Sequence, residues 1–352
     1  MNYRLLGNSG LKVSEICFGV MTFTGEKGWT HLGKQTQKDA DYLAGLAIDN
    51  GVNFFDTADV YSNGISETML GKALGAKRQN VVIATKGEGH MWDGPNGDGH
   101  SKAHLIRACE ESLRRLKTDY IDLYQVHSFD FTTPLEETME VLDLLVKSGK
   151  VRYTGISNFF GWQVVKMQSI AEKHNLAKLT SLQAYYSIVG RDLEYDLVPA
   201  CLEEGMGIIV WSPLHGGILT GKYRSQEKWP KDTRLKGPGQ HLPYNVERGE
   251  LILDKLEEIA QKRKVTMSQT ALNYALNKPG ITSVIIGARN KKQLLDNITA
   301  GSWKLSAEEM KELDEVSMPE RIYPYWYFDI FKKDSMEKYF RNMFRKENKD
   351  GV

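Results

Sequence analysis

The chain has 352 residues, 41% of them hydrophobic, and its 46 Lys and Arg balance 45 Asp and Glu to a formal net charge of +1. This balance excludes a global attraction to nucleic acid or to an anionic membrane, so we expect neither as a partner. No apolar run approaches the ~20 residues of a membrane span, and there is no signal-peptide pattern or CxxC pair, so we expect a cytoplasmic protein with reduced thiols.

The pattern along the chain begins with a predicted β-hairpin, in which residues 3–6 and 11–14 flank the turn sequence Gly7-Asn8-Ser9-Gly10. From residue 15 onward, short apolar runs alternate with segments of helical periodicity. The runs predict strands at 15–18, 52–55, 81–86, 120–126, 151–156, 181–182, 207–210 and 283–286. The periodic segments predict helices at 37–50, 65–74, 101–116, 134–148, 162–174, 196–204, 251–264, 267–277 and 291–299.

Three helix starts have capping signals. Ser101 is an expected N-cap, and Thr133 with Glu136 forms a predicted capping box that has Pro134 at the first helical position. A second capping box at residues 306–309 predicts an extra helix outside the repeat.

The strict alternation of strands and helices predicts a parallel sheet. Eight strands, each followed by a helix and with no Pro/Ser-rich linker between them, predict one closed (β/α)₈ TIM barrel over residues 1–320. The hairpin would close its bottom, and long loops at 87–100 and 214–248 would lie over its C-terminal face. An open doubly wound sheet is the alternative, but no GxGxxG sequence follows the first strand.

Residues 321–352 form a distinct aromatic and basic tail. Because so much aromatic surface is costly to leave in water, we expect the tail to pack on the barrel, across its mouth, or in an interface. Its basic residues from 332 to 349 are typical of a solvated terminus, and a partner surface is the alternative. The aromatic side chains are Tyr323, Tyr325, Trp326, Tyr327, Phe328 and Phe331.

Polar side chains recur where the predicted strands end. The carboxyl ends of barrel strands point into one shared space, where such folds place their chemistry. Taken singly, each residue has an ordinary reading, such as a helix cap for Asp56 or a solvated strand end for Lys86. Their recurrence favours a site. The residues are Asp56, Lys86, His127, Asn158, Gln183 and Arg289, with Tyr61 one loop beyond Asp56.

Tyr61, Lys86, Asp56 and His127 together indicate proton transfer. A free tyrosine has a pKa near ~10, which is too high for efficient transfer at neutral pH. We expect the charge of Lys86 to lower the pKa of Tyr61 and Asp56 to hold Lys86 in place. His127 would share the proton or orient a carbonyl oxygen. These roles suit protonation of a developing alkoxide, with hydride supplied by a cofactor.

These segments resemble the aldo-keto reductase family from about residue 3 to residue 316. The resemblance rests on the residues at 51–61 with Glu67, and on the segments 82–86, 119–127, 155–159 and 285–289 with Gln293 and Asn297. It implies a TIM barrel that binds a nicotinamide cofactor without a Rossmann fold. It also implies a catalytic set of Asp56, Tyr61, Lys86 and His127, in which Tyr61 is the general acid.

The same resemblance implies a set of cofactor-binding residues. Ser157, Asn158 and Gln183 would hold the nicotinamide carboxamide, and Trp211 would stack on its ring. Arg289, with the nearby Lys291 and Lys292, would pair with a 2′-phosphate, which favours NADP over NAD. Asp296 stands where many members have Glu. The remaining implied contacts are Thr22, Ser212, Leu214, Gly216, Leu219, Gly221 and Lys222 along the strand ends and pyrophosphate loop, and Gly287, Ala288, Gln293 and Asn297 around the adenosine.

We therefore expect an NADPH-dependent reductase that converts an aldehyde or a ketone to an alcohol. Sugar-derived carbonyl compounds are included among the expected substrates. The alternative is an NADP-binding, redox-sensing subunit with slow turnover, since the sequence also resembles potassium-channel β-subunits. Pocket walls are expected among Phe23, Trp29, Trp92, Phe159 and the tail. An oligomer is compatible with this reading.

Two further motifs do not indicate a site of their own. Residues 216–222 nearly match a phosphate-binding P-loop, but Tyr223 stands where Ser or Thr should reach Mg²⁺. His100 and His104 have the spacing of a metal pair, but no third ligand supports a site, so we expect no metal. They are instead expected in a loop and in the first turn of a helix.

Overall fold

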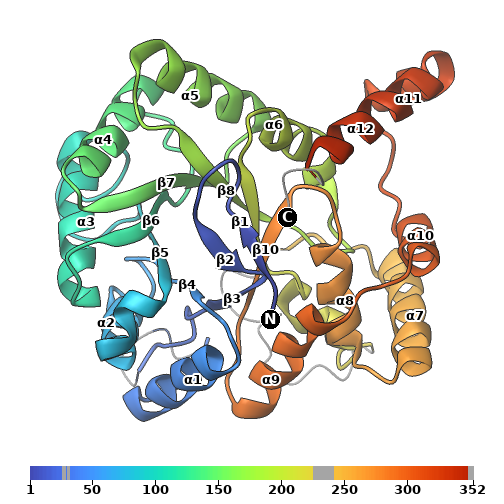
Figure 1. Ribbon diagram of the computed structural model, residues 1–352, viewed down its shortest axis with the longest axis horizontal. Helices are drawn as coiled ribbons and strands as arrows, with labels where there is room; N and C mark the ends of the chain where they lie inside the picture. The colour runs from blue at the N-terminus through green and yellow to red at the C-terminus, as the bar shows by residue number, and fades with distance from the viewer. Residues whose placement is uncertain (26–28, 30–31, 225–241, 348–352) are drawn as a thin grey trace.

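The computed structural model describes residues 1–25, 29, 32–224 and 242–347 of the chain. Within these residues eight parallel strands close into a barrel in the order β10-β3-β4-β5-β6-β7-β8-β9 (Figure 1). Closure is made by β10 pairing with β3, where Val284 opposes Ile16 and Ile286 opposes Phe18. The predicted TIM barrel is confirmed, and the open doubly wound sheet is excluded. The barrel strands are β3 Ile16–Gly19, β4 Phe54–Asp56, β5 Val82–Gly87, β6 Ile121–Val126, β7 Val151–Ser157, β8 Leu179–Tyr185, β9 Gly207–Trp211 and β10 Ile281–Ile286.

Helices form the outer layer of the barrel (Figure 1). Their buried apolar faces join the outward side chains of the strands in one large core, which includes Leu43, Leu105, Leu142 and Leu256. The helices are α1 Gln37–Asp49, α2 Ile65–Leu74, α3 Lys102–Leu116, α4 Leu135–Lys147, α5 Gly161–His174, α6 Leu197–Glu203, α7 Val246–Arg263, α8 Met267–Leu276 and α9 Lys291–Thr299. No helix of the described ranges combines the length and apolar character needed to cross a membrane.

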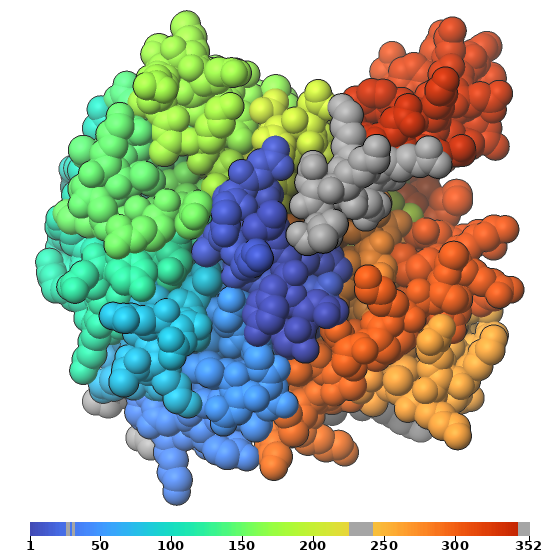
Figure 2. Space-filling view, in the orientation of Figure 1, coloured from blue at the N-terminus to red at the C-terminus, as the bar shows by residue number. Residues whose placement is uncertain are grey.

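The predicted hairpin, β1 Tyr3–Leu5 and β2 Lys12–Ser14, closes the amino-terminal end of the barrel. It lies in front of the barrel in Figure 1 and covers the centre of the face seen in Figure 2. Leu6 and Val13 pack with Cys17 and Phe54 in a second, smaller core. Gly7 has a φ of +56°, and a Cβ there would lie 2.5 Å from the carbonyl oxygen of Gly205, so the turn requires glycine.

Local sequence rules failed at two places. The predicted capping box of α4 is wrong, because Pro134 is the N-cap and has no side-chain cap, while the Thr133 hydroxyl donates to Asp130 Oδ2. Strand β8 is longer than the predicted 181–182, because its polar residues interrupt the apolar run that marks a buried strand. One of them, Ser181, is nevertheless fully buried.

The chain continues beyond the barrel into three more helices. The capping box at Ser306 and Glu309 starts α10, Ala307–Val316, as predicted. The tail then forms α11, Tyr325–Phe331, and α12, Lys333–Glu347. Its described part lies beside α6 on the outer flank of the barrel and not across the mouth (Figure 1). Residues 348–352 of the predicted tail, and 225–241 of the predicted long loop, lie outside the described residues.

Candidate active site

The predicted polar residues converge at the carboxyl ends of the barrel strands. Asp56 ends β4, Lys86 is the next-to-last residue of β5, and His127 follows β6 directly. Ser157 ends β7 and lies opposite Gln183 of β8 in the parallel register. The barrel therefore gathers these side chains from five strands, as the sequence predicted.

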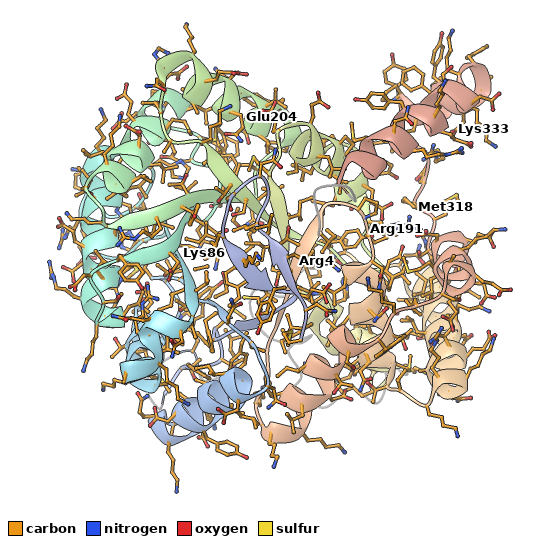
Figure 3. The ribbon with its side chains drawn as sticks, in the orientation of Figure 1. Arg4, Lys86, Arg191, Glu204, Met318 and Lys333 are labelled. Atoms are coloured by element: carbon orange, nitrogen blue, oxygen red, sulfur yellow. The ribbon has the colours of Figure 1, made fainter. Side chains whose placement is uncertain are left out.

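Lys86 and Asp56 form a buried ion pair. The Lys86 side chain, labelled in Figure 3, is fully buried, and its Nζ donates to Asp56 Oδ1 at 2.7 Å and Oδ2 at 2.9 Å. A third hydrogen bond goes to the carbonyl oxygen of Thr57 at 2.7 Å. Burial disfavours the ammonium, but the charge and hydrogen bonds of Asp56, with a contribution from Tyr61, together outweigh this effect, so the pKa of Lys86 is raised. The site thus contains a permanent, fixed positive charge.

Tyr61 lies directly against this charge. Lys86 Nζ is 5.2 Å from the centroid of the Tyr61 ring. Burial raises the pKa of Tyr61, and the Lys86 charge lowers it by less, so the net pKa is above the ordinary value. The prediction that Lys86 would bring this pKa below its usual value is therefore wrong for the protein alone, since desolvation of the phenolate is the larger effect. Tyr61 keeps its proton at neutral pH, which is the state a proton donor requires.

His127 completes the group around the phenol. Its ring centroid is 5.6 Å from that of Tyr61, in an edge-to-face arrangement. Burial, with a smaller contribution from the Lys86 charge, lowers the pKa of His127 to about 3. The imidazole is therefore neutral near pH 7 and suited to orient a carbonyl oxygen by a hydrogen bond, rather than to act as a second cation.

A hydrogen-bonded chain links the next strand ends. Gln183 Nε2 donates to Asp56 Oδ2 at 2.7 Å, a contact that the sequence did not predict. Asn158, at a φ of +60°, donates from Nδ2 to the carbonyl oxygen of His127 at 2.9 Å and to Ser157 Oγ at 3.1 Å. Trp211 Nε1 donates to Asn158 Oδ1 at 3.1 Å. These bonds connect the half-buried Trp211 ring, through the Asn158 side chain, to the backbone of His127.

The loop after β9 follows Trp211 into the predicted pyrophosphate segment. Ser212 has a φ of +54°, and Gly216, Gly217 and Gly221 also have positive φ values. This backbone turns sharply around a short 3₁₀ helix, His215–Thr220, in which Leu219 is buried and Leu214 and Gly216 are half-buried. Lys222 is exposed at its far end. A right-handed residue followed by a left-handed one, as at Leu214 and His215, is the geometry that aims successive backbone N–H groups at an anion.

His215 in this loop was missed by sequence reasoning. It is buried, and its Nδ1 is 2.6 Å from the hydroxyl of Tyr185, whose ring centroid is 5.1 Å from that of Trp211. Burial lowers the pKa of His215 to about 4 and raises that of Tyr185 to about 12, so both are neutral. The contact between His215 and Tyr185 thus connects the loop after β9 to Tyr185, whose ring packs on Trp211. No sequence pattern connects His215, which stands next to glycines, with Tyr185, which lies 30 residues earlier in the chain.

The end of β10 and the start of α9 gather the other predicted cofactor residues. The side chain of Gln293 accepts from the backbone N–H of Arg289 at 2.9 Å, and Asn297 Nδ2 donates to the carbonyl oxygen of Gly287 at 3.5 Å. Ala288 is buried. Asp296, the predicted departure from Glu, accepts from Gln269 Nε2 at 2.7 Å and from Thr266.

Of the aromatic residues expected to line the substrate pocket, some lie at the site and others lie in the core. The Trp29 ring lies 6.2 Å from that of Tyr61. Phe23 is instead fully buried against Phe18, and the ring of Phe159 is nearly parallel to that of His100, at 6.1 Å. Trp92 packs on His104 at 4.7 Å. His100 and His104 have the predicted loop and first-turn positions, and both are buried.

The arrangement fits a bound dinucleotide. Thr22, which follows β3 at the same end of the barrel, is buried, and its hydroxyl has no hydrogen-bond partner among the described residues. A Cβ added to Gly287 would meet no atom within 4 Å, so there is open space at the end of β10. Arg289, Lys291 and Lys292 are exposed beside it at the N-terminus of α9. A vacant buried donor, open space and cationic groups at a helix N-terminus suit a phosphate-bearing ligand.

Fold and site together define a (β/α)₈ barrel with a buried ion pair, a tyrosine and a histidine gathered at the carboxyl ends of its strands. The model of the Aldo/keto reductase family matches residues 15–318, and the chain belongs to this family. It is therefore an oxidoreductase, and the family uses nicotinamide cofactors.

Curated relatives agree with this assignment. The chain is 36% identical to an "Uncharacterized oxidoreductase YrpG" of Bacillus subtilis, over 90% of this chain and 96% of the relative. It is 33% identical to the "Versiconal hemiacetal acetate reductase" of Aspergillus parasiticus, over 92% of this chain and 99% of the relative. It is also 34% identical to a "Probable voltage-gated potassium channel subunit beta" of Arabidopsis thaliana, over 85% of this chain and 91% of the relative.

Proposed function

We propose that the protein reduces an aldehyde or ketone to an alcohol with NADPH. The observation that carries this proposal is the Lys86–Asp56 ion pair beside the protonated Tyr61, with the neutral imidazole of His127 edge-to-face with the phenol ring. Such a group protonates an oxygen on which negative charge develops. Reduction of a carbonyl is the reaction in this family that creates this oxygen.

The residues divide the proton transfer among them. A nicotinamide cofactor held by these residues would supply the hydride that the carbonyl carbon receives. The Tyr61 O–H bond breaks and its proton forms the new O–H bond of the alcohol, which leaves a phenolate that solvent reprotonates. Lys86 stabilises that phenolate through its charge, while its hydrogen bonds to Asp56 and Thr57 hold the ammonium in place. His127 donates a hydrogen bond that orients the carbonyl oxygen.

The proposed cofactor site extends from Thr22 and the Ser157–Asn158–Gln183 group, past Trp211 and the loop to Lys222, to residues 287–297. The exposed cations Arg289, Lys291 and Lys292 support the preference for NADPH, since a 2′-phosphate gains charge-assisted hydrogen bonds there that a hydroxyl does not. Binding of NADPH and NADH, followed by cofactor and Trp fluorescence, tests both claims. If neither cofactor binds, the proposed function is rejected, and equal affinity for the two rejects the preference.

Replacing Tyr61 by Phe tests the chemistry. We expect turnover with a panel of aldehydes and ketones to fall by about 10²–10⁴-fold, because general acid catalysis is lost. NADPH affinity should change little, because the ring remains. Tyr42→Phe is a matched control, since Tyr42 is an exposed tyrosine of α1. Unchanged turnover in the Tyr61 variant would contradict the proton-donor role.

A slow NADP-binding sensor is the second candidate function, supported by the similarity to proteins named as potassium-channel β-subunits. A sensor of this kind would oxidise its bound NADPH once and release NADP slowly. Multiple-turnover and single-turnover rates, measured with the same carbonyl compound, separate the two. Steady-state turnover close to the single-turnover rate favours the reductase.

A further inference from the structure

The tail carries an exposed apolar surface that the barrel does not cover. The family match ends at residue 318, so α11 and α12 lie beyond the shared barrel. In Figure 2 the tail stands as a red lobe at the upper right, outside the ring of helices. Ile330 is 66% exposed and Phe331 62%, and Trp326 and Tyr327 are also exposed. Contiguous apolar side chains of this size mark interaction sites.

Only one side of the tail packs on the barrel. Tyr325 places its ring 5.4 Å from that of Tyr195, and its hydroxyl donates to the carbonyl oxygen of Tyr195. On α12, Met336, Phe340 and Met343 are half-buried and share one helical face. This side accounts for the attachment of the tail, and it leaves the opposite face of α12 to solvent.

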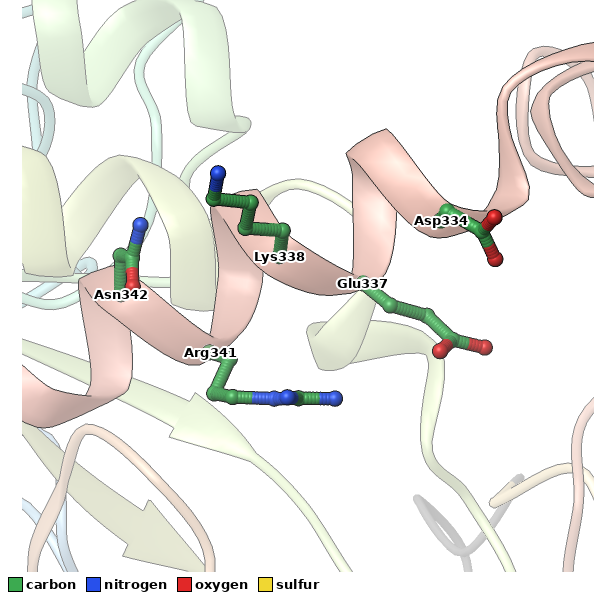
Figure 4. A pocket seen from close by; sticks show the side chains of 5 residues that line it. All are labelled: Asp334, Glu337, Lys338, Arg341 and Asn342. Atoms are coloured by element: carbon green, nitrogen blue, oxygen red, sulfur yellow. The ribbon is translucent and has the colours of Figure 1, made fainter.

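That opposite face carries a stripe of four exposed charged residues, Asp334, Glu337, Lys338 and Arg341 (Figure 4). With Asn342 they line a shallow depression along the helix. The positions follow the i, i+3, i+4, i+7 spacing of a helix stripe. Their spacing would allow Asp334–Lys338 and Glu337–Arg341 pairs, yet within the described part of the chain these four side chains form no ion pair.

The order of charges in the stripe is self-complementary. Two acidic positions come first and two basic positions follow, symmetrically about the point between Glu337 and Lys338. In an antiparallel pair of α12 helices, Asp334 lies opposite Arg341 of the second copy, and Glu337 lies opposite Lys338 of the second copy. A two-fold axis repeats both contacts, as an isologous interface requires.

We propose that the tail is the interface of a two-fold homodimer, in which α12 packs antiparallel to α12 of a second copy and the exposed apolar side chains of α11 are covered. The exposed residues of these two helices, which contain 7 and 15 residues in all, would form an interface at the small end of the size range of specific complexes. An anionic membrane is a poorer match, because Asp334 and Glu337 lie within the stripe and would be repelled.

Charge reversal in the full-length protein tests this register. Asp334→Lys/Glu337→Lys makes the stripe wholly basic, and Lys338→Glu/Arg341→Glu makes it wholly acidic. Each variant alone should dissociate by at least about tenfold more than the wild type, because four attractive pairs become repulsive. A mixture of the two should form a heterodimer, and the fourfold variant, which regains self-complementarity, should dimerise. Sedimentation velocity and light scattering over a concentration series measure all four.

Apolar substitutions and controls complete the test. Trp326→Ser/Phe331→Ser should weaken the dimer, whereas Phe131→Ser, at an exposed aromatic far from the tail, should not. Circular dichroism verifies that each variant is folded. A monomeric wild type, or an oligomer that both charge-reversed variants leave intact, overturns the proposal. So does a mixture that fails to associate. None of these outcomes depends on the proposed catalytic activity.

Discussion

Lys86 is the residue on which the electrostatics of the site depend. A fully buried ammonium is tolerated in a protein interior only when its charge is paired and its protons are hydrogen-bonded. Asp56 and the Thr57 carbonyl meet both requirements, and Gln183 donates a further hydrogen bond to Asp56. The pair is therefore expected to matter more for positioning a charge beside Tyr61 than for the stability of the barrel.

A double-mutant cycle in urea tests this view. Lys86→Met should lower the free energy of unfolding by about 3–5 kcal/mol, because it leaves the Asp56 carboxylate buried and unpaired. The double variant Lys86→Met/Asp56→Asn should recover most of this loss while turnover stays low. A double variant that is no more stable than Lys86→Met would mean that Asp56 is not the partner that balances the charge.

Neutral buried histidines predict a loss of stability in mild acid. The unfolded chain protonates His127 and His215 near their ordinary pKa of ~6.5, whereas the folded protein binds those protons only near pKa values of about 3 and about 4. Between these values the unfolded state binds more protons, so the free energy of unfolding is highest above pH ~6.5 and falls as the pH is lowered toward ~4. Urea unfolding from pH 7 to pH 4.5 measures this slope.

His215→Phe isolates the contribution of one histidine. His215 is buried, so its removal should reduce the slope by up to about 1.4 kcal/mol per pH unit in that window. At pH 7 the variant loses its bond to Tyr185, and the loop beyond Trp211 should release bound NADPH faster. His174→Phe, at the exposed end of α5, is a control that should leave the slope unchanged. An unchanged slope in His215→Phe would show that this imidazole titrates normally.

At the scale of elements, one arginine fastens α10 to the barrel. Arg191, labelled in Figure 3, is 8% exposed and forms a two-bond pair with Glu194, at 2.9 and 2.8 Å. The third guanidinium nitrogen of Arg191, Nη1, donates to the carbonyl oxygen of Asp314 at 3.0 Å and to Ser317 Oγ at 2.8 Å. One guanidinium thus joins the segment before α6 to the last turn of α10.

Arg191→Met should destabilise this docking by about 1.5–3 kcal/mol, since Glu194 loses its two-bond partner and keeps only Lys278 and the Tyr186 hydroxyl, while Asp314 and Ser317 lose a donor. Hydrogen exchange should increase in α10, while the strands of the barrel keep their protection. Arg114→Met removes an exposed pair with Glu111 and should cost less than about 1 kcal/mol. Equal effects of the two substitutions would show that Arg191 is not the fastening point.

At the scale of the whole molecule, the barrel closes without the tail. Every strand pairs with two neighbours, and the hairpin seals the amino-terminal end. Deletion of residues 321–352 should therefore leave the circular dichroism spectrum and cooperative unfolding of the barrel intact, with a melting temperature lowered by only a few degrees. Thermal unfolding followed at 222 nm measures this outcome. Loss of cooperative folding would mean that the tail belongs to the core.

The strand ends were the most predictable part of the protein. Apolar runs that end abruptly in Asp56, Lys86 or His127 indicate where each strand ends, because polar side chains of such barrels gather at the carboxyl ends of the strands. The length of β8 and the cap of α4 were less predictable. In β8 the polar Ser181 is buried by tertiary packing, and before α4 the hydroxyl of Thr133 bonds to Asp130 and does not cap the helix. Rules based on neighbouring residues include neither effect.

The sequence by itself determined the alternation, the closed barrel and the set of residues at its mouth, since periodicity and strand-end polarity are properties of neighbouring residues. Only the tertiary structure decided that desolvation outweighs Lys86 at Tyr61, that His215 meets Tyr185, and that α12 turns a self-complementary stripe to solvent. Burial and contact between distant segments set each of these features. These features depend on which distant segments pack together, and local sequence patterns do not reveal that.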